Sequence, residues 1–312
     1  MSYRQTVTKN PVAWTRFAVT PATLMGDPRW WGDYEVGADA LLEEPGYVEL
    51  LGRVATHGRS TQAGYHLRVD DRGNWMLYRQ DFAVFGKWIT PLDSGRVDMG
   101  INQWHRLGLR MTGDSIVALY DGKPVGTVMD DYYTSGQIGL AVSPWHHAQF
   151  DNVTVGKTRE WPQLIPQQEM SVVDATSQMN NFYKGYTFKA DYAIDGRPET
   201  AWYTGWEPKL GLPQSITVDL GRKREVSGII CQPRYDSWNI IGETLGHITR
   251  CNVYLSEDGE AYELAGTANW TPGSAVRKLE WQGPRKARFV RIEAAEGTND
   301  AASIGELQII GQ

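Results

Sequence analysis

The sequence predicts an all-β protein built from two β-sandwiches, and three observations lead to this expectation. The length of 312 residues suits two domains of ordinary size. Helical periodicity is nearly absent from the chain. Short runs of alternating polar and apolar residues recur instead between turn signals, which is the pattern of sandwiches and barrels.

The first half of the chain divides into a series of short predicted strands. Asp121-Gly122 separates two of them and is typical of a two-residue hairpin turn. Ala148–Val155 closes this half, so we expect a jelly-roll sandwich of the concanavalin or laminin-G kind over residues 1–156. The clearest runs are Tyr34–Ala40, Tyr47–Arg53, Tyr65–Val69, Asn74–Arg79, Trp104–Met111, Ser115–Tyr120, Lys123–Met129 and Gln137–Val142.

A polar stretch that contains Pro162 and Pro166 follows the first half. Proline and polar residues between two alternating segments are typical of a connection between domains. We therefore expect a linker over residues 157–169 and a second β-sandwich over residues 170–312.

Composition and charge exclude several classes of protein. The net charge is −6, from 31 basic and 37 acidic residues without a large block of either sign, which argues against nucleic acid as the main partner. No apolar stretch is long enough to predict a transmembrane segment. The start, Met1–Gln5, lacks the apolar core of a signal peptide. The chain is therefore either cytoplasmic or a piece of a longer secreted protein, and we expect the second.

Cys231 and Cys251 are the two cysteines of the chain. Both fall in predicted strands, and their spacing is not that of a metal site. Two buried free thiols are the expected state, while a disulfide between neighbouring strands stays open.

Oxygen-bearing side chains gather in two segments of the second half. Asp195 and Thr200 lie five residues apart across a turn that contains Gly196, and Glu306 lies near the far end. Carboxylate, hydroxyl and carbonyl oxygens are the donors that Ca²⁺ prefers. The sequence therefore predicts a structural calcium that joins the two ends of this domain.

These segments also resemble a known family, the discoidin or coagulation factor 5/8 type C fold, in its bacterial form the family 32 carbohydrate-binding module. The resemblance covers about residues 170–312 and implies a second jelly roll. The blocks that carry it are Ala193–Trp202, Ile216–Gly221, Pro233-Arg234, Val253–Gly259, Arg288–Ile292 and Gly305–Leu307.

The resemblance implies which groups hold the calcium. The side chains of Asp195, Thr200 and Glu306 match the family's positions, and the matched backbone carbonyls are those of Tyr192, Arg197 and Gly305. In the first half, Asp27 and Asp151 are candidates for another Ca²⁺, because such sandwiches often join their first and last strands in this way.

The resemblance also implies a sugar site on loops at the metal's end of the sandwich. Arg234 matches a donor of galactose-binding relatives, with a local salt bridge to Asp236 as the alternative. Tyr203 stands where many relatives have His, a departure that bears on galactose specificity. The remaining candidates are aromatic or polar loop residues that suit sugar faces or hydroxyls, namely Trp206, Asp236, Trp238 and Asn239.

A second set of sequence blocks occurs in order in the first half, namely Arg4-Gln5, Pro11–Trp14, Gly26-Asp27, Trp30-Trp31, Leu51–Val54, Gln103–His105 and Ala148–Asn152. Over about residues 1–156, these blocks resemble the C-terminal lectin-like domain of galactocerebrosidases (glycoside hydrolase family 59). That family cleaves galactosides on a TIM barrel, and this chain has neither the alternating pattern nor the length for one. We carry over no catalytic residue and expect an upstream catalytic domain in a longer parent chain.

Two functions follow from this reading. The first is the non-catalytic, carbohydrate-binding part of a secreted glycoside hydrolase, which binds galactose-type glycans near a structural calcium. The alternative is a cell-surface or membrane adhesion module, acting through the apolar residues of Phe182-Tyr183 and Ser237–Ile241. In neither function is this chain itself an enzyme.

Overall fold

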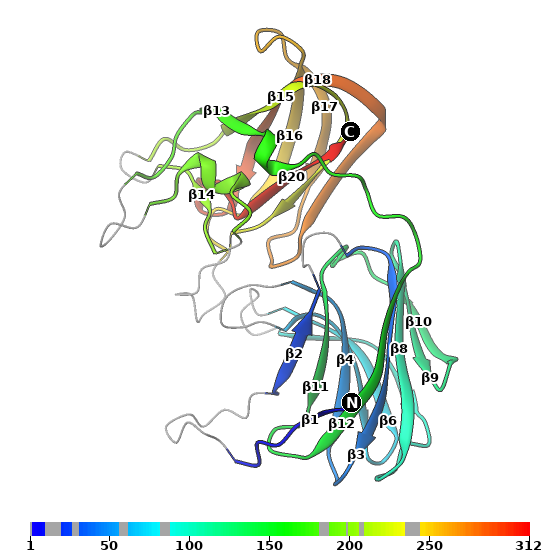
Figure 1. The fold of residues 1–312 in the computed structure, drawn as a ribbon. Helices are drawn as coiled ribbons and strands as arrows, with labels where there is room; N and C mark the ends of the chain where they lie inside the picture. Colours follow the sequence, from blue (N-terminus) through cyan, green and yellow to red (C-terminus); the bar gives the residue numbers. More distant parts are fainter. Residues whose placement is uncertain are drawn as a thin grey trace. The chain divides into compact units, whose positions relative to one another are not determined.

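The computed structural model divides the chain into two compact units, with the boundary between Trp161 and Pro162. Each unit is an antiparallel β-structure, as expected (Figure 1). The described residues are 2–9, 20–26, 31–55, 62–81, 88–180, 187–197, 199–205, 209–234 and 244–312.

The first unit is a sandwich of two 6-stranded sheets. One sheet has the order β1-β12-β3-β8-β9-β10 and the other the order β2-β11-β4-β5-β6-β7. The strands are β1 (Tyr3–Arg4), β2 (Ala22–Met25), β3 (Tyr34–Leu42), β4 (Tyr47–Ala55), β5 (Ala63–Asp70), β6 (Asn74–Gln80), β7 (Ile89–Arg96), β8 (Trp104–Thr112), β9 (Ser115–Tyr120), β10 (Lys123–Met129), β11 (Gln137–Val142) and β12 (Ala148–Lys157).

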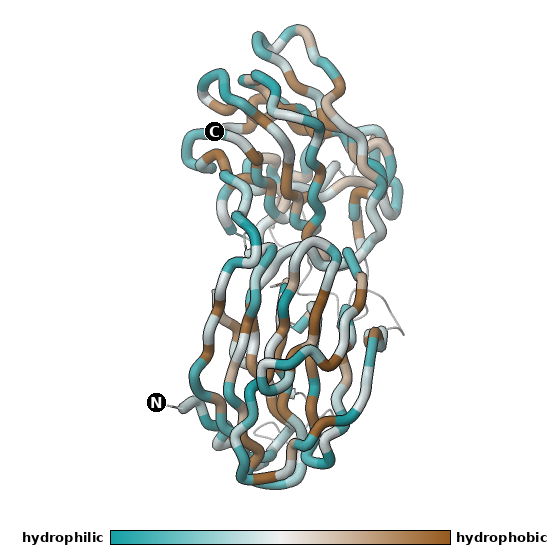
Figure 2. The backbone as a smooth tube through the Cα atoms, turned by 90° about the vertical axis from the view of Figure 1, so that its right-hand side faces the viewer, coloured by the Kyte–Doolittle hydropathy of each residue, from teal (hydrophilic) through white to brown (hydrophobic). Residues whose placement is uncertain are grey.

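Alternation along the strands forms the core of this sandwich. On β3, Tyr34, Val36 and Ala38 are fully buried, while the intervening Glu35 pairs with Arg110 on β8. Figure 2 shows hydrophobic and hydrophilic residues alternating along the strands. Because successive side chains of a strand point to opposite faces, one face of each sheet supplies the core.

The predicted hairpin at Asp121-Gly122 is confirmed. It joins β9 to β10, and both residues have positive φ, 48° and 76°. This is the backbone that a two-residue hairpin with the twist of the flanking strands requires.

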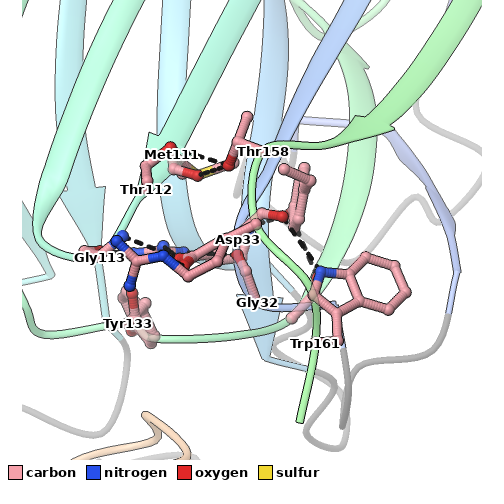
Figure 3. A network of polar contacts seen from close by, with 12 residues as sticks. Gly32, Asp33, Met111, Thr112, Gly113, Tyr133, Thr158 and Trp161 are labelled. Carbon is pink, nitrogen blue, oxygen red and sulfur yellow. Dashed lines mark hydrogen bonds and ion pairs between the residues drawn. The ribbon is translucent and has the colours of Figure 1, made fainter.

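Arg53 is fully buried in the first unit and belongs to a polar network. Figure 3 shows this network and labels its members Gly32, Asp33, Gly113 and Tyr133. The Arg53 guanidinium donates to the carbonyls of Gly32 (3.1 Å), Gly113 (2.9 Å) and Tyr133 (2.9 Å), and to the carboxylate of Asp33 (2.9 Å). Burial lowers the pKa of Arg53 from its ordinary value, and the negative charge of Asp33 opposes this shift. A buried cation is tolerated when its donors are satisfied in this way.

The same network holds the end of the first unit. The carbonyl of Asp33 accepts hydrogen bonds from the Trp161 indole and the Thr158 backbone, both at 3.1 Å. The Trp161 ring stacks on Trp31 with 5.7 Å between the ring centroids. Residues 158–161, expected as linker, are therefore packed on the first sandwich (Figure 3).

The second unit has one 6-stranded sheet that contains two long strands, and a 2-stranded pair of β14 and β19. The order is β13-β15-β18-β16-β17, with β20 paired to β15. Its elements are η1 (Gln167–Glu169), β13 (Ser171–Ala175), η3 (Ala190–Ile194), β14 (Trp202–Tyr203), β15 (Gln214–Gln232), β16 (Ile248–Ser256), β17 (Glu263–Asn269), β18 (Arg277–Gly297), η4 (Thr298–Asp300), β19 (Ser303–Ile304) and β20 (Glu306–Gly311).

The two long strands allow this sheet to close around its own core. The first half of β15 pairs with β13 and its second half with β20, with breaks in register between Asp219 and Arg224 and between Val226 and Gly228. The core includes Trp202, the last residue of the Ala193–Trp202 block, which is fully buried. Cys231 and Cys251 are buried free thiols, and burial raises the pKa of Cys231 to about 12.

The segment before β13 also belongs to the second unit. Ile165 is buried, and its N–H donates to the carbonyl of Ile309 at 3.0 Å. The carbonyl of Gln163 accepts from the N–H of Gly311 at 2.9 Å. The stretch expected as a linker is thus divided between the two units, because Trp161 is half-buried against the first unit and Ile165 is buried in the second.

Candidate functional site

Arg234 lies just beyond the end of β15, with its guanidinium stacked against two aromatic rings. The guanidinium carbon is 4.3 Å from the ring centroid of Phe188 and 4.7 Å from that of Tyr203. The two rings meet edge to face, with centroids 6.2 Å apart. Arg234 is only 8% exposed and Tyr203 only 2%. Cation–π contacts of this kind hold the guanidinium plane in one orientation.

Tyr203 is fixed by its neighbours in the fold. It lies on β14, opposite Ser303 of β19, and its carbonyl accepts from the N–H of Met179 at 3.0 Å. The backbone of Gly246 approaches the ring so closely that a Cβ there would lie 2.6 Å from Tyr203 Cε2. Gly246 also has a φ of +69°, so two independent constraints require glycine.

A substitution of Gly246 tests this packing. We expect Gly246→Ala to displace the Tyr203 ring. The free energy of unfolding should fall by about 1–3 kcal/mol more than the backbone strain of alanine at a positive φ would lower it. Gly283→Ala is the matched control, because Gly283 has a φ of +71° and nothing within 4 Å of its Cβ position. Thermal and urea unfolding measure both variants, and equal losses would contradict the role of the ring contact.

The backbone of Arg234 is held by His247, which is also buried. His247 Nδ1 faces the N–H of Gly273 at 3.3 Å and therefore accepts, so its Nε2–H donates to the Arg234 carbonyl at 2.9 Å. A Cβ on Gly305 would lie 2.8 Å from the Pro233 carbonyl oxygen. The His247 imidazole and the absence of a side chain at Gly305 thus fix the position of the Pro233-Arg234 segment.

The turn after η3 brings three of the expected metal ligands together. Thr200 Oγ1 lies 2.9 and 2.8 Å from the two carboxylate oxygens of Asp195, and 2.8 Å from the carbonyl oxygen of Arg197. Gly196 has a φ of +76°, which the turn requires. Carboxylate, hydroxyl and carbonyl oxygens thus converge, and this donor set fits Ca²⁺.

The other expected ligands lie on neighbouring elements. Glu306 begins β20 and is buried, and its carboxylate accepts a hydrogen bond from the Gln167 amide. β20 contacts η3, which carries Tyr192, and Gly305 directly precedes Glu306. Within the described ranges there is no group of three or more His, Cys, Asp or Glu side chains that could hold a metal, so the set depends on two carboxylates and neutral oxygens.

In the first sandwich, Asp151 lies on β12 opposite Asp39 of β3. Asp151 accepts from the N–H of Asn152 at 2.8 Å, and the Asn152 amide donates to Asp39 at 2.7 Å. Arg106 pairs with Asp39 at 2.9 Å. The second calcium site stays a prediction, because Asp27 lies outside the described residues.

Several expected sugar contacts also lie outside the described residues, namely Trp206, Asp236, Trp238 and Asn239. The same holds for Phe182-Tyr183 and Ser237–Ile241, on which the adhesion alternative depends. Of the expected sugar contacts, the structure brings Tyr203 and Arg234 together. It adds Phe188 and His247, which the sequence analysis missed because no motif or strand alternation marks either residue.

Comparison with known families accounts for both sandwiches. The family model described as the galactocerebrosidase C-terminal lectin domain matches residues 1–158, about half of the chain. The chain belongs to this family. The model for the F5/8 type C domain matches residues 172–307. The chain is therefore a galactocerebrosidase-type lectin domain followed by an F5/8 type C domain, and both expected resemblances are confirmed.

Curated relatives match this lectin and F5/8 type C pair over different lengths. An A type blood N-acetyl-α-D-galactosamine deacetylase of Flavonifractor plautii is 25% identical over 97% of this chain and 43% of its own. A sialidase of Micromonospora viridifaciens is 28% identical over 61% of this chain and 27% of its own. The galactocerebrosidase of Canis lupus familiaris is 26% identical over 50% of this chain and 23% of its own. The chain thus spans less than half the length of each of these relatives.

Solved structures of carbohydrate-binding modules each match about half of the chain. A Clostridium perfringens module in complex with GalNAc-β-1,3-galactose is 31% identical, over 47% of this chain and 99% of its own, with a TM-score of 0.43. The family 32 module of Clostridium perfringens NanJ in complex with galactose is 32% identical, over 47% of this chain and 96% of its own, with a TM-score of 0.41.

Among the described residues, no helix is long and apolar enough to cross a membrane.

Proposed function

We propose that this chain is a non-catalytic carbohydrate-binding part of a longer, secreted glycoside hydrolase, and that its F5/8 type C domain binds galactose-type glycans. The observation that carries the proposal is the Arg234 guanidinium stacked against Tyr203 and Phe188. The guanidinium carbon lies within 4.7 Å of both ring centroids, so the two rings hold the guanidinium in place. A planar fork of donors suits two vicinal hydroxyls of a pyranose.

The names of relatives support the class of ligand. The galactocerebrosidase and the galactosamine deacetylase both carry galactose-type sugars in their names. A module of this kind increases the local concentration of an attached enzyme on a glycan surface without chemistry of its own. Tyr203, in the position where galactose-binding relatives often have His, is only 2% exposed, so it bears on the choice of sugar through its contact with Arg234.

We further propose that a calcium ion stabilises the turn beside this site. The side chains of Asp195, Thr200 and Glu306 and the carbonyls of Tyr192, Arg197 and Gly305 would hold it. When bound, the ion supplies positive charge to the carboxylates. Its role would be structural, because its ligands would join the turn after η3 to the start of β20.

Substitution of Arg234 tests the sugar site. We expect Arg234→Ala to weaken galactose binding at least tenfold in a calorimetric titration, because charged hydrogen bonds contribute about 1.5–3 kcal/mol each. Arg291→Ala is the matched control, since Arg291 stacks on Tyr262 at 3.8 Å in the same sandwich. A glycan array extends the test to other sugars. Unchanged galactose affinity in a folded Arg234→Ala protein would contradict the proposal.

A further inference from the structure

The second sandwich carries a groove that the proposed sugar site does not use. The groove has a volume of about 550 Å³ and is lined by residues of β13, by Ser177, Gln178 and Asn180, by the start of η3, and by Gly205 and Leu210. This volume lies within the range of small-molecule binding sites, which is about 300–1,000 Å³. The groove is therefore large enough for a sugar residue.

The groove and the Arg234 site lie on opposite sides of one short segment. Met179 packs with Tyr203 and Phe188, and its N–H donates to the Tyr203 carbonyl. Its chain neighbours Gln178 and Asn180 line the groove instead. The two sites thus share a backbone segment but no side chain, so a ligand in the groove makes its own contacts.

Hydrogen-bonding groups in the groove are available to a ligand. Across the part of the chain that the structure describes, no hydrogen bond or ion pair engages the side chains of Asp174, Asn180 and Asp191. The Gln178 side chain is fixed, because its Oε1 accepts from the N–H of Ala190 at 2.8 Å. The carboxylates of Asp174 and Asp191 can accept hydrogen bonds, and the amides of Gln178 and Asn180 can donate as well as accept them. This set of groups suits a ligand rich in hydroxyl groups.

Apolar side chains border these polar groups. Val173 is 53% exposed and Leu210 is 59% exposed, and both line the groove. A pyranose has apolar C–H faces and polar edges, so it matches a surface with this mixture. The two carboxylates repel an anionic ligand and so disfavour acidic sugars.

We propose that this groove is a second glycan-binding site, specific for a neutral sugar residue. Asp174 and Asp191 accept hydrogen bonds from its hydroxyls, Asn180 donates and accepts, and Val173 and Leu210 cover its C–H groups. This inference goes beyond the proposed function, since the groove binds sugar even when Arg234 is absent. Two sites on one domain increase the avidity for a branched or clustered glycan.

The test uses the full chain with the first site removed. Saturation-transfer NMR of the Arg234→Ala protein is recorded with galactose, glucose, N-acetylgalactosamine and lactose, and with sialyllactose as the acidic probe. We expect signals from at least one neutral sugar and a weaker signal from sialyllactose. Adding Asp174→Ala and Asp191→Ala is expected to remove the remaining signal.

The matched control is Glu260→Ala/Glu263→Ala in the same background, which makes the same change in charge at exposed positions. Leu210→Ala is a milder groove variant, and we expect a partial loss from it with unchanged melting. The inference is overturned if the Arg234→Ala protein binds none of these sugars, if the groove variants bind as well as the control, or if sialyllactose binds best. Binding that survives Arg234→Ala in full but disappears with the groove variants would overturn the first site and support the groove.

Discussion

Replacing Arg53 by methionine is expected to lower the free energy of unfolding of the first sandwich by about 3–5 kcal/mol. The substitution leaves the Asp33 carboxylate and the carbonyls of Gly32, Gly113 and Tyr133 without their shared donor. Removing one partner of a buried ion pair costs this much because the other partner keeps its desolvation penalty. Domains are stable by only about 5–15 kcal/mol, so the loss is a large fraction.

Hydrogen-exchange mass spectrometry measures this loss in peptides from β3 and β4, and so separates the first sandwich from the second. The control is Arg159→Ala, because Arg159 contacts the same carboxylate at 3.4 Å but its side chain is 64% exposed. An exposed pair contributes at most about 1 kcal/mol. A loss in Arg53→Met no larger than in the control would show that the network adds little to stability.

Removing calcium is expected to destabilise the second sandwich and leave the first unchanged. At a free calcium concentration one hundred times the dissociation constant, binding stabilises the folded state by about 2.7 kcal/mol. Calorimetry in calcium and in EGTA measures this as a shift of one of two unfolding transitions. Asp195→Ala in calcium is expected to melt like the unmodified protein in EGTA.

Glu199→Ala is the control for the calcium experiment. Glu199 lies on the same turn, is exposed and pairs with Arg197 at 3.3 Å, but it is outside the expected ligand set. It should keep the calcium response of the unmodified protein. The same melting temperature in calcium and in EGTA would mean that the oxygens around Thr200 form only a hydrogen-bonded turn.

Strand alternation predicted β3 to β6 and β8 to β12, because one face of each strand is buried in the core. It did not reveal β7 (Ile89–Arg96), which contains Pro91 and Gly95 and lies at the edge of its sheet. Proline is tolerated in an edge strand, because the position of its missing N–H can face solvent and no hydrogen bond between strands is then lost. It also interrupts the alternation of polar and apolar residues by which a strand is recognised in a sequence.

The candidate site was predicted in part. Oxygen donors spaced across a turn marked Asp195 and Thr200 in the sequence, and the resemblance to the F5/8 type C family marked Arg234. Phe188 and His247 are 46 and 13 residues from Arg234 in the chain. They contact Arg234 only in the folded structure, where β14, β15 and their loops converge. A contact of this kind has no local signature in one sequence.

The division of residues 157–169 between the two sandwiches determines where the chain can be divided into separate domains. A fragment that begins at residue 172, where the F5/8 type C match starts, lacks Ile165 and the backbone that bonds to Ile309 and Gly311. Such a fragment presents the outer edge of β20 to solvent as an unpaired strand, and unpaired edges recruit other chains. Expression of the second sandwich alone therefore calls for a start at Pro162, and shorter fragments should self-associate.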